Sequence, residues 1–213
     1  NGDGSFSEIG QLAGISNTDW SWSSLFADLD NDGFQDLFVS NGFKREFINN
    51  DFLKYKADLL MKVKKGLKFD KMEDIIHKMP SNKVHNYVFM NSNGLAFKDV
   101  STAWGFDLEN LTNGAAYADL DNDGDIDLVM NNLDEVAKIY RNNAERLVKN
   151  NFLKIKLQGD DQNTYGLGAT ITLFCGDKLM KRTLCPYRGF QSSMEPVVFF
   201  GLDTISTIDS LTL

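Results

Sequence analysis

Short runs in which apolar and polar residues alternate recur along the chain, and such runs are typical of half-buried antiparallel strands. The clearest are Phe152–Leu157 and Thr170–Leu173. Two pairs of short apolar runs also flank two acidic segments, and these pairs are 22–27 with 36–39 and 115–118 with 127–130. We therefore expect a mainly β fold in which each acidic segment joins two sequential strands.

The interval from about 43 to 86 has a different, helical period. Asp51–Lys65 spaces its apolar residues as one face of a helix and stops before Gly66, a natural C-terminal glycine. A second helix is expected from Asp70, a candidate N-cap, to Pro80. The first helix has a surplus of lysines, which we interpret as a solvated face: Lys54, Lys56, Lys62, Lys64 and Lys65. We expect this helical insertion to form a lid or side-arm.

An internal repeat organises the first 150 residues. Ala27–Gly33 returns as Ala118–Gly124, at an offset of 91 residues counted from the first aspartate of each copy. The likeness extends to both sides, so the repeating unit is strand, turn, strand, acidic loop, strand. Units of this kind are typical of propeller blades. Two blades cannot close a propeller, so we predict a partial β-propeller whose remaining blades lie upstream.

Residues 151–213 are predicted to form a second, small antiparallel β domain. A hairpin is expected with Thr170–Cys175 as one strand and Lys178–Cys185 as the other, turning at Gly176 and Asp177. Cys175 then faces Lys178, far along the ladder from Cys185, so a disulfide cannot form. Both thiols are expected to be reduced and buried.

The net charge of the chain indicates which classes of partner to expect. Acidic residues outnumber basic ones by 30 to 22, a formal net charge of −8, which disfavours nucleic acid and anionic membranes and favours cations. No apolar run approaches the roughly 20 residues that a membrane-spanning helix needs.

Candidate chemistry lies in the two acidic loops. Counted from the first aspartate, carboxylates stand at positions 1, 3, 5 and 9, glycine at position 6, and a backbone carbonyl is available at position 7. Alternate carboxylates on a sharply turned loop can converge on one point, and oxygen-only ligation suits Ca²⁺. The predicted ligands of two calcium sites are Asp28, Asp30, Asp32, Phe34 (carbonyl) and Asp36, and Asp119, Asp121, Asp123, Asp125 (carbonyl) and Asp127.

Three alternatives to two calcium loops follow from the same residues. An EF-hand needs glutamate at position 12 and flanking helices, but position 12 is Val39 or Met130 within strand-like sequence. Mg²⁺ demands tighter octahedral geometry, and softer metals recruit His or Cys, which neither loop contains. Metal-free turns rich in Asp and Asn remain an alternative, although two loops sharing every ligand position disfavour it.

These loops carry a family resemblance. With the Asp-x-Asp-x-Asp-Gly-x-x-Asp signature in both copies, 1–150 resembles the FG-GAP or VCBS repeats of integrin-α-like calcium-binding propellers. The tail resembles the ASPIC/UnbV domain through Tyr165–Ala169, Arg188–Ser193 and Phe199–Leu202. It departs from the usual ending in Phe199 and Asp203, and it stops before a Trp-Pro pair, so we expect an incomplete tail.

The resemblance implies a secreted, periplasmic or cell-surface protein, of bacterial type, that serves adhesion or binds an extracellular glycan or protein ligand, with calcium stabilising the inter-strand loops. It supplies no catalytic residue, and we expect a protein that is not an enzyme. A calcium-dependent polysaccharide lyase, using for example Tyr87, Tyr117 or Arg188, and a purely structural spacer stay open. The three tryptophans are expected to pack in cores, and His77 and His85 to lie on the surface.

Overall fold

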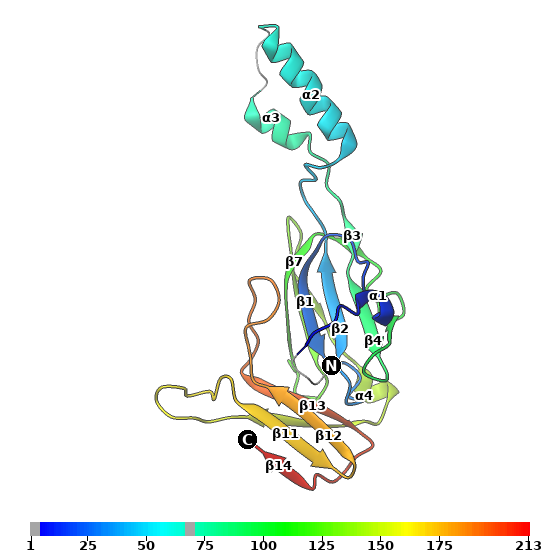
Figure 1. The fold of residues 1–213 in the computed structure, drawn as a ribbon, viewed down its shortest axis with the longest axis vertical. Coiled ribbons are helices and arrows are strands. Elements are labelled where there is room, and N and C mark those ends of the chain that lie inside the picture. The colour runs from blue at the N-terminus through cyan, green and yellow to red at the C-terminus, as the bar shows by residue number, and fades with distance from the viewer. Residues whose placement is uncertain (1–4, 67–70) are drawn as a thin grey trace.

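The computed structural model of the protein describes residues 5–66 and 71–213, which form three parts along its long axis (Figure 1). A helical arm stands at one end, two antiparallel sheets form the middle, and a smaller β domain lies at the other end. The prediction of a mainly β fold is confirmed. The sheets of the described residues form no closed barrel.

The first sheet has the strand order β1-β2-β4-β5, with antiparallel neighbours. Its strands are β1 (Ser21–Ala27), β2 (Asp36–Asn41), β4 (Tyr87–Asn91) and β5 (Phe97–Asp99). Every residue of β2 is buried, because this central strand is covered on both faces. Phe38 faces the main core, while Leu37 and Val39 pack with Phe89 on the other side.

The second sheet repeats the start of the first. Its order is β7-β8-β9, formed by β7 (Thr112–Ala118), β8 (Asp127–Asn132) and β9 (Lys138–Tyr140). Ala118 pairs with Asp127 just as Ala27 pairs with Asp36, and both strand pairs carry an irregularity at their far end. A two-stranded ladder of β3 (Val84–His85) and β6 (Glu109–Asn110) lies beside them.

The two sheets share one core. Its fully buried members come from both sheets and include Leu25, Phe38, Val88 and Met130. Burying a side chain of this size contributes about 1.5–3 kcal/mol, so this shared core holds the two repeat copies together.

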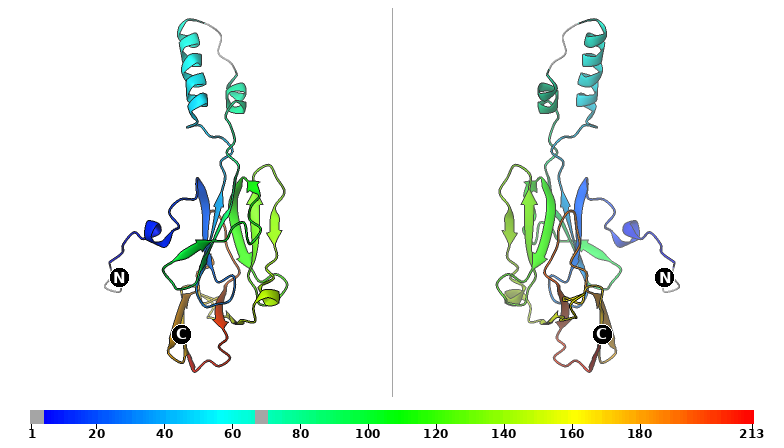
Figure 2. Two further views of the ribbon diagram at one scale, coloured as in Figure 1. Left: turned by 90° about the vertical axis from the view of Figure 1, so that its right-hand side faces the viewer. Right: turned by 90° about the vertical axis from the view of Figure 1, so that its left-hand side faces the viewer.

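The predicted repeat unit differs from the structure at its first strand. In the second copy this strand is β5, which pairs with β4 of the first sheet. In the first copy residues 5–9 form no strand, and a short helix, α1 (Gly10–Ala13), follows them. This segment extends away from the sheets (Figure 2), with no neighbouring strand among the described residues to pair with it.

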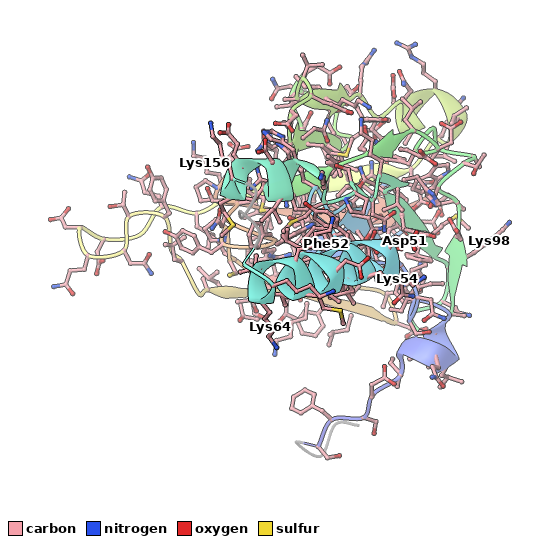
Figure 3. The ribbon with its side chains drawn as sticks, turned by 90° about the horizontal axis from the view of Figure 1, so that it is seen from above. Asp51, Phe52, Lys54, Lys64, Lys98 and Lys156 are labelled. Atoms are coloured by element: carbon pink, nitrogen blue, oxygen red, sulfur yellow. The ribbon has the colours of Figure 1, made fainter. Side chains whose placement is uncertain are left out.

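The arm between β2 and β3 contains α2 (Asn50–Lys64) and α3 (Met72–His77). The Asn49 side chain caps α2, which ends before Gly66 as predicted. Phe52, Leu59 and Ile75 form a small core between the helices. In Figure 3 Phe52 lies between the two helices and Lys64 at the far end of α2. Asp70, the predicted cap of the second helix, lies outside the described residues.

The C-terminal part contains two sheets. One pairs β10 (Asn151–Lys156) with β13 (Val197–Asp203), and the other has the order β12-β11-β14. The bounds of the latter are β11 (Thr170–Cys175), β12 (Lys178–Thr183) and β14 (Ser210–Thr212). Their core includes Ile171, Leu173 and Phe200, and a short helix, α4 (Ala144–Leu147), precedes β10.

The cysteine prediction is half right. Cys175 is buried, pairs with Lys178 and is free, as expected. Cys185 is also free but exposed, so the expected burial of both thiols is wrong. The reason is that β12 ends at Thr183, which leaves Cys185 in the irregular segment that follows the hairpin.

Candidate metal centres

Each acidic loop makes the same tight reversal between two strands. The residue at position 4 (Asn31 or Asn122) and the glycine at position 6 (Gly33 or Gly124) have positive φ, between 58° and 97°. Asparagine and glycine tolerate this left-handed backbone better than other residues do. The local sequence therefore sets the loop shape, which turns alternate side chains toward one interior point.

The structure brings the carboxylates at positions 1, 3 and 5 together in both loops. Oxygens of Asp28, Asp30 and Asp32 lie within 4.8 Å of one another, and those of Asp119, Asp121 and Asp123 do the same. Such crowding is destabilising between like charges, and a divalent cation at the centre would make it favourable.

One carboxylate oxygen in each loop has no partner in the protein, and a bound metal ion would give it one. Asp28 is 3% exposed and Asp119 is 8% exposed, yet the Oδ1 atom of each is buried and accepts no hydrogen bond. Only one other buried side-chain polar atom in residues 5–66 and 71–213 shares this property, Oδ1 of Asn113. A buried carboxylate oxygen without a partner costs free energy, and a hard cation at this atom would remove that cost.

The position-9 aspartates, predicted as ligands, are placed differently. Asp36 accepts main-chain N–H bonds from Leu29 (2.9 Å) and Asn91 (2.8 Å), one to each carboxylate oxygen. Asp127 accepts the matching pair from Leu120 (3.0 Å) and Asn142 (2.7 Å). Each therefore ties its loop to the end of the neighbouring strand in the same sheet, at Asn91 of β4 or at Asn142 just beyond β9.

This geometry predicts a stability cost that does not depend on metal. In Asp36→Ala, two buried N–H groups lose their acceptor, at about 1–3 kcal/mol each. We expect about 2–6 kcal/mol less unfolding free energy in urea with chelator present, and a similar loss for Asp127→Ala. Asp32→Ala, which removes a half-exposed carboxylate, should cost less than about 1 kcal/mol under the same conditions. Equal losses for Asp36→Ala and Asp32→Ala would contradict this role for Asp36.

The position-7 residues also differ. Phe34 has an exposed ring, and the use of its carbonyl as a ligand stays a prediction. The Asp125 side chain is buried and accepts bonds from Asn31 Nδ2 (2.8 Å) and Glu145 N (2.6 Å), and its carboxylate lies within 4.8 Å of those of Asp123 and Glu145. The Asn31 amide also donates to the Gly124 carbonyl, so the two loops are in direct contact.

The two loops differ in their surroundings. In the first, burial and then the neighbouring carboxylates of Asp32 and Asp30 raise the pKa of Asp28 to about 7. Burial likewise raises the pKa of Asp30 and Asp32, and it raises that of Asp36 to about 8. The ion-free first loop therefore holds protons at a pH where ordinary aspartates are ionised.

The second loop has basic partners of its own. Arg141 Nε lies 2.6 Å from Asp121 Oδ2, and its Nη2 lies 2.8 Å from Asp123 Oδ2. Lys154 Nζ is 3.6 Å from Asp119 Oδ2. Burial acts to raise the pKa of Asp123, but the hydrogen bonds, chiefly from Arg141, outweigh it and lower the pKa. Arg141 thus supplies part of the positive charge that an ion would bring.

A calcium ion in the second loop would therefore compete with Arg141 for the same carboxylates. We expect Arg141→Gln to raise the calcium affinity of this loop roughly twofold to fivefold, the range of an exposed ion pair. Calcium titration of Asp30→Ala chains, which keep only the second loop intact, measures this change. Arg146→Gln, which removes a nearby arginine paired with Glu145 alone, is the matched control. An unchanged affinity in Arg141→Gln would exclude competition.

The sequence did not point to Arg141, Glu145 or Lys154, because they belong to other elements. Asn91 and Asn142 occupy matching places, at the end of β4 and just beyond the end of β9, the strands that pair with β2 and β8. Tyr117 accepts a bond from Arg188 (3.3 Å), Tyr87 stacks on Phe89 in a separate cluster, and His77 and His85 belong to no potential metal group among the described residues.

Comparison with known families agrees with both resemblances. Residues 1–39 match the FG-GAP-like repeat, and residues 159–213 match the family described as ASPIC and UnbV. No curated protein matches the chain. Within the described ranges, every helix is too short or too polar to cross a membrane.

Proposed function

This chain combines an FG-GAP-like repeat with an ASPIC and UnbV domain, and we propose that it is a calcium-binding module acting outside the cytoplasm. In this proposal two calcium ions hold the acidic loops in shape, and the sheets form part of an integrin-like β-propeller. The module binds an extracellular glycan or protein and catalyses no reaction.

One observation carries the calcium proposal. In both copies the position-1 aspartate belongs to a cluster of three carboxylates, and its Oδ1 atom is buried without a hydrogen-bond partner. A single such atom could be an accident of packing, but the same atom recurs in two loops 91 residues apart. The residues that would hold the ions are Asp28, Asp30 and Asp32 in one loop, and Asp119, Asp121 and Asp123 in the other.

The donor chemistry favours calcium among divalent ions. Neither group contains His or Cys, which excludes the usual ligand sets of zinc and copper. The flexible, mainly carboxylate shell that these loops offer suits Ca²⁺, whereas Mg²⁺ needs near-octahedral geometry and retains water.

A cavity beside the loops is the best candidate for partner contact. It has a volume of about 610 Å³ and lies between the two sheets. Aromatic side chains of Trp104, Phe106 and Tyr140 line it, and Asp30 and Asn143 are among its polar residues. Aromatic faces beside polar groups can stack on sugar rings or on aromatic protein side chains.

Partner capture tests the binding function. The chain would be applied to arrays of extracellular glycans and matrix proteins, once in millimolar calcium and once in chelator. Retention on a defined class of glycan or protein, lost in chelator and in Asp30→Ala with Asp121→Ala, supports the proposal. Release of unsaturated oligosaccharides from a polysaccharide would show a lyase instead, and calcium binding with no retained partner would favour a spacer.

A further inference from the structure

The C-terminal β domain contacts the first acidic loop through main-chain hydrogen bonds. Gly201 N of β13 donates to Asp28 Oδ2 (3.1 Å), and Asp203 N donates to the Asn31 carbonyl (2.8 Å). Arg182 of β12 adds a bond from Nη2 to the Gly33 carbonyl (3.2 Å). Three positions of one loop are therefore held by two strands that follow about 150 or more residues later.

Asp28 links this contact to the ion site. Its Oδ2 accepts from Gly33 N within the loop and from Gly201 N of the C-terminal domain. Its Oδ1 is the buried oxygen that has no partner. A cation bound at Oδ1 would fix the orientation of the Asp28 carboxylate. That orientation also places Oδ2, the atom to which Gly201 N donates.

Gly201 permits the close approach because it has no side chain. A Cβ atom there would lie 2.2 Å from Asp28 Oδ2 and 2.6 Å from the main chain of Asn31. Glycine inside a strand often marks such a site of close backbone approach. Gly201 belongs to the Phe-Gly-Leu segment at 200–202, so part of the tail motif serves this contact.

A second tail segment reinforces the same interface. The loop around 188–193 runs up beside β1 and β7 (Figure 1). Phe190 N donates to Ser23 Oγ (2.9 Å), and the Arg188 guanidinium donates to the Tyr117 hydroxyl (3.3 Å). This loop thus bridges the first and second sheets. The second acidic loop, by contrast, shares no main-chain hydrogen bond with residues 151–213 in the described part of the chain.

We infer that calcium binding at the first loop and docking of the C-terminal β domain are coupled, with Gly201 as the positioning residue. The inference rests on the proposed calcium function and goes beyond it, because it assigns the two loops different roles. Main-chain N–H groups of β13 hold the first loop to the C-terminal domain, whereas the second loop contacts that domain through side chains of β10, with Lys154 beside Asp119 and Phe152 beside Gly124. Coupling of this kind is reciprocal, so disturbing the docked strand must weaken calcium binding and removing calcium must loosen the strand.

Calcium titration of single-loop chains tests the first direction. Asp121→Ala leaves only the first loop intact, and Asp30→Ala leaves only the second. We expect Gly201→Ala to lower affinity at least tenfold in the Asp121→Ala chain and less than threefold in the Asp30→Ala chain. Thr212→Ala, in exposed β14 of the same domain, is the control and should change neither affinity. Equal effects of Gly201→Ala in both chains, or no effect in either, would overturn the inference.

Hydrogen exchange tests the reverse direction without altering Gly201. Calcium should slow amide exchange at Gly201 and Asp203 in the Asp121→Ala chain and leave it unchanged in the Asp30→Ala chain. Should Gly201→Ala fail to fold, Arg182→Lys is the milder variant: it keeps the positive charge near Asp28 and loses the guanidinium bond to the Gly33 carbonyl, with an expected loss of about threefold in the first loop alone. Calcium binding with no change in exchange refutes the coupling only. Absence of calcium binding in both single-loop chains refutes the proposed function as well.

Discussion

Calcium is expected to raise the thermal unfolding midpoint by about 10–20 °C over the ion-free chain. A ligand at 100 times its Kd stabilises the folded state by about 2.7 kcal/mol per site, so two sites contribute about 5 kcal/mol. For a chain of this length each kcal/mol shifts the midpoint by roughly 2–4 °C. Differential scanning calorimetry in millimolar calcium, in millimolar magnesium and in chelator measures the shift, and magnesium should produce a much smaller one.

The loops account for this shift only if their carboxylates are required. We expect the double variant Asp30→Ala, Asp121→Ala to unfold at the same temperature with and without calcium. A control variant, Asp58→Ala with Asp161→Ala, removes the same charge from exposed positions outside the loops and should keep the full shift. A shift that survives in the loop variant would place calcium elsewhere.

The second large effect is an inverted pH dependence of the ion-free chain. Burial raises the pKa of Asp28 to about 7 and that of Asp36 to about 8, above the value of 3.8 expected when unfolded. The folded chain therefore binds more protons than the unfolded chain between about pH 4 and pH 8. Its stability rises as the pH falls through this window and declines as the pH rises. One unit of pKa difference corresponds to about 1.4 kcal/mol, so the change is on the order of several kcal/mol.

The calcium-bound chain should behave in the opposite way, because protons compete with calcium for the same carboxylates. The stabilisation by calcium is then largest near pH 8 and small near pH 5. Thermal scans at pH 5, 6.5 and 8 would use buffers depleted of calcium by a chelating resin, since soluble chelators weaken in acid. In Asp36→Asn much of the ion-free pH dependence should vanish. An ion-free midpoint that falls steadily from pH 8 to pH 5 would contradict the raised pKa values.

The acidic loops could be predicted from sequence because their geometry is local. Asn31 and Gly33, like Asn122 and Gly124, supply the left-handed backbone that turns alternate aspartates inward. The same is true of α2, whose end before Gly66 was predicted from spacing and a terminal glycine. In both cases the decisive residues belong to the element itself or follow it closely in the sequence.

The features that were missed depend on pairing between distant segments. The likeness between the two copies placed β5 in the unit of the second loop, but it cannot tell which sheet a strand joins, and β5 pairs with β4 of the first. Asp36 and Asp127 fit the ligand spacing and their role as ligands stays a prediction, but the sequence did not reveal that they accept N–H bonds from Asn91 and Asn142. No sequence pattern marked Arg141, because its ion pairs with the second loop depend on how β9 runs past that loop.

Calcium stoichiometry, measured by titration calorimetry on the metal-free chain, tests most directly whether the two loops are calcium sites. We expect two ions bound per wild-type chain, one in each of the Asp30→Ala and Asp121→Ala variants, and none in the double variant. Binding of no calcium by the folded wild-type chain, or of two ions by the double variant, would contradict the assignment.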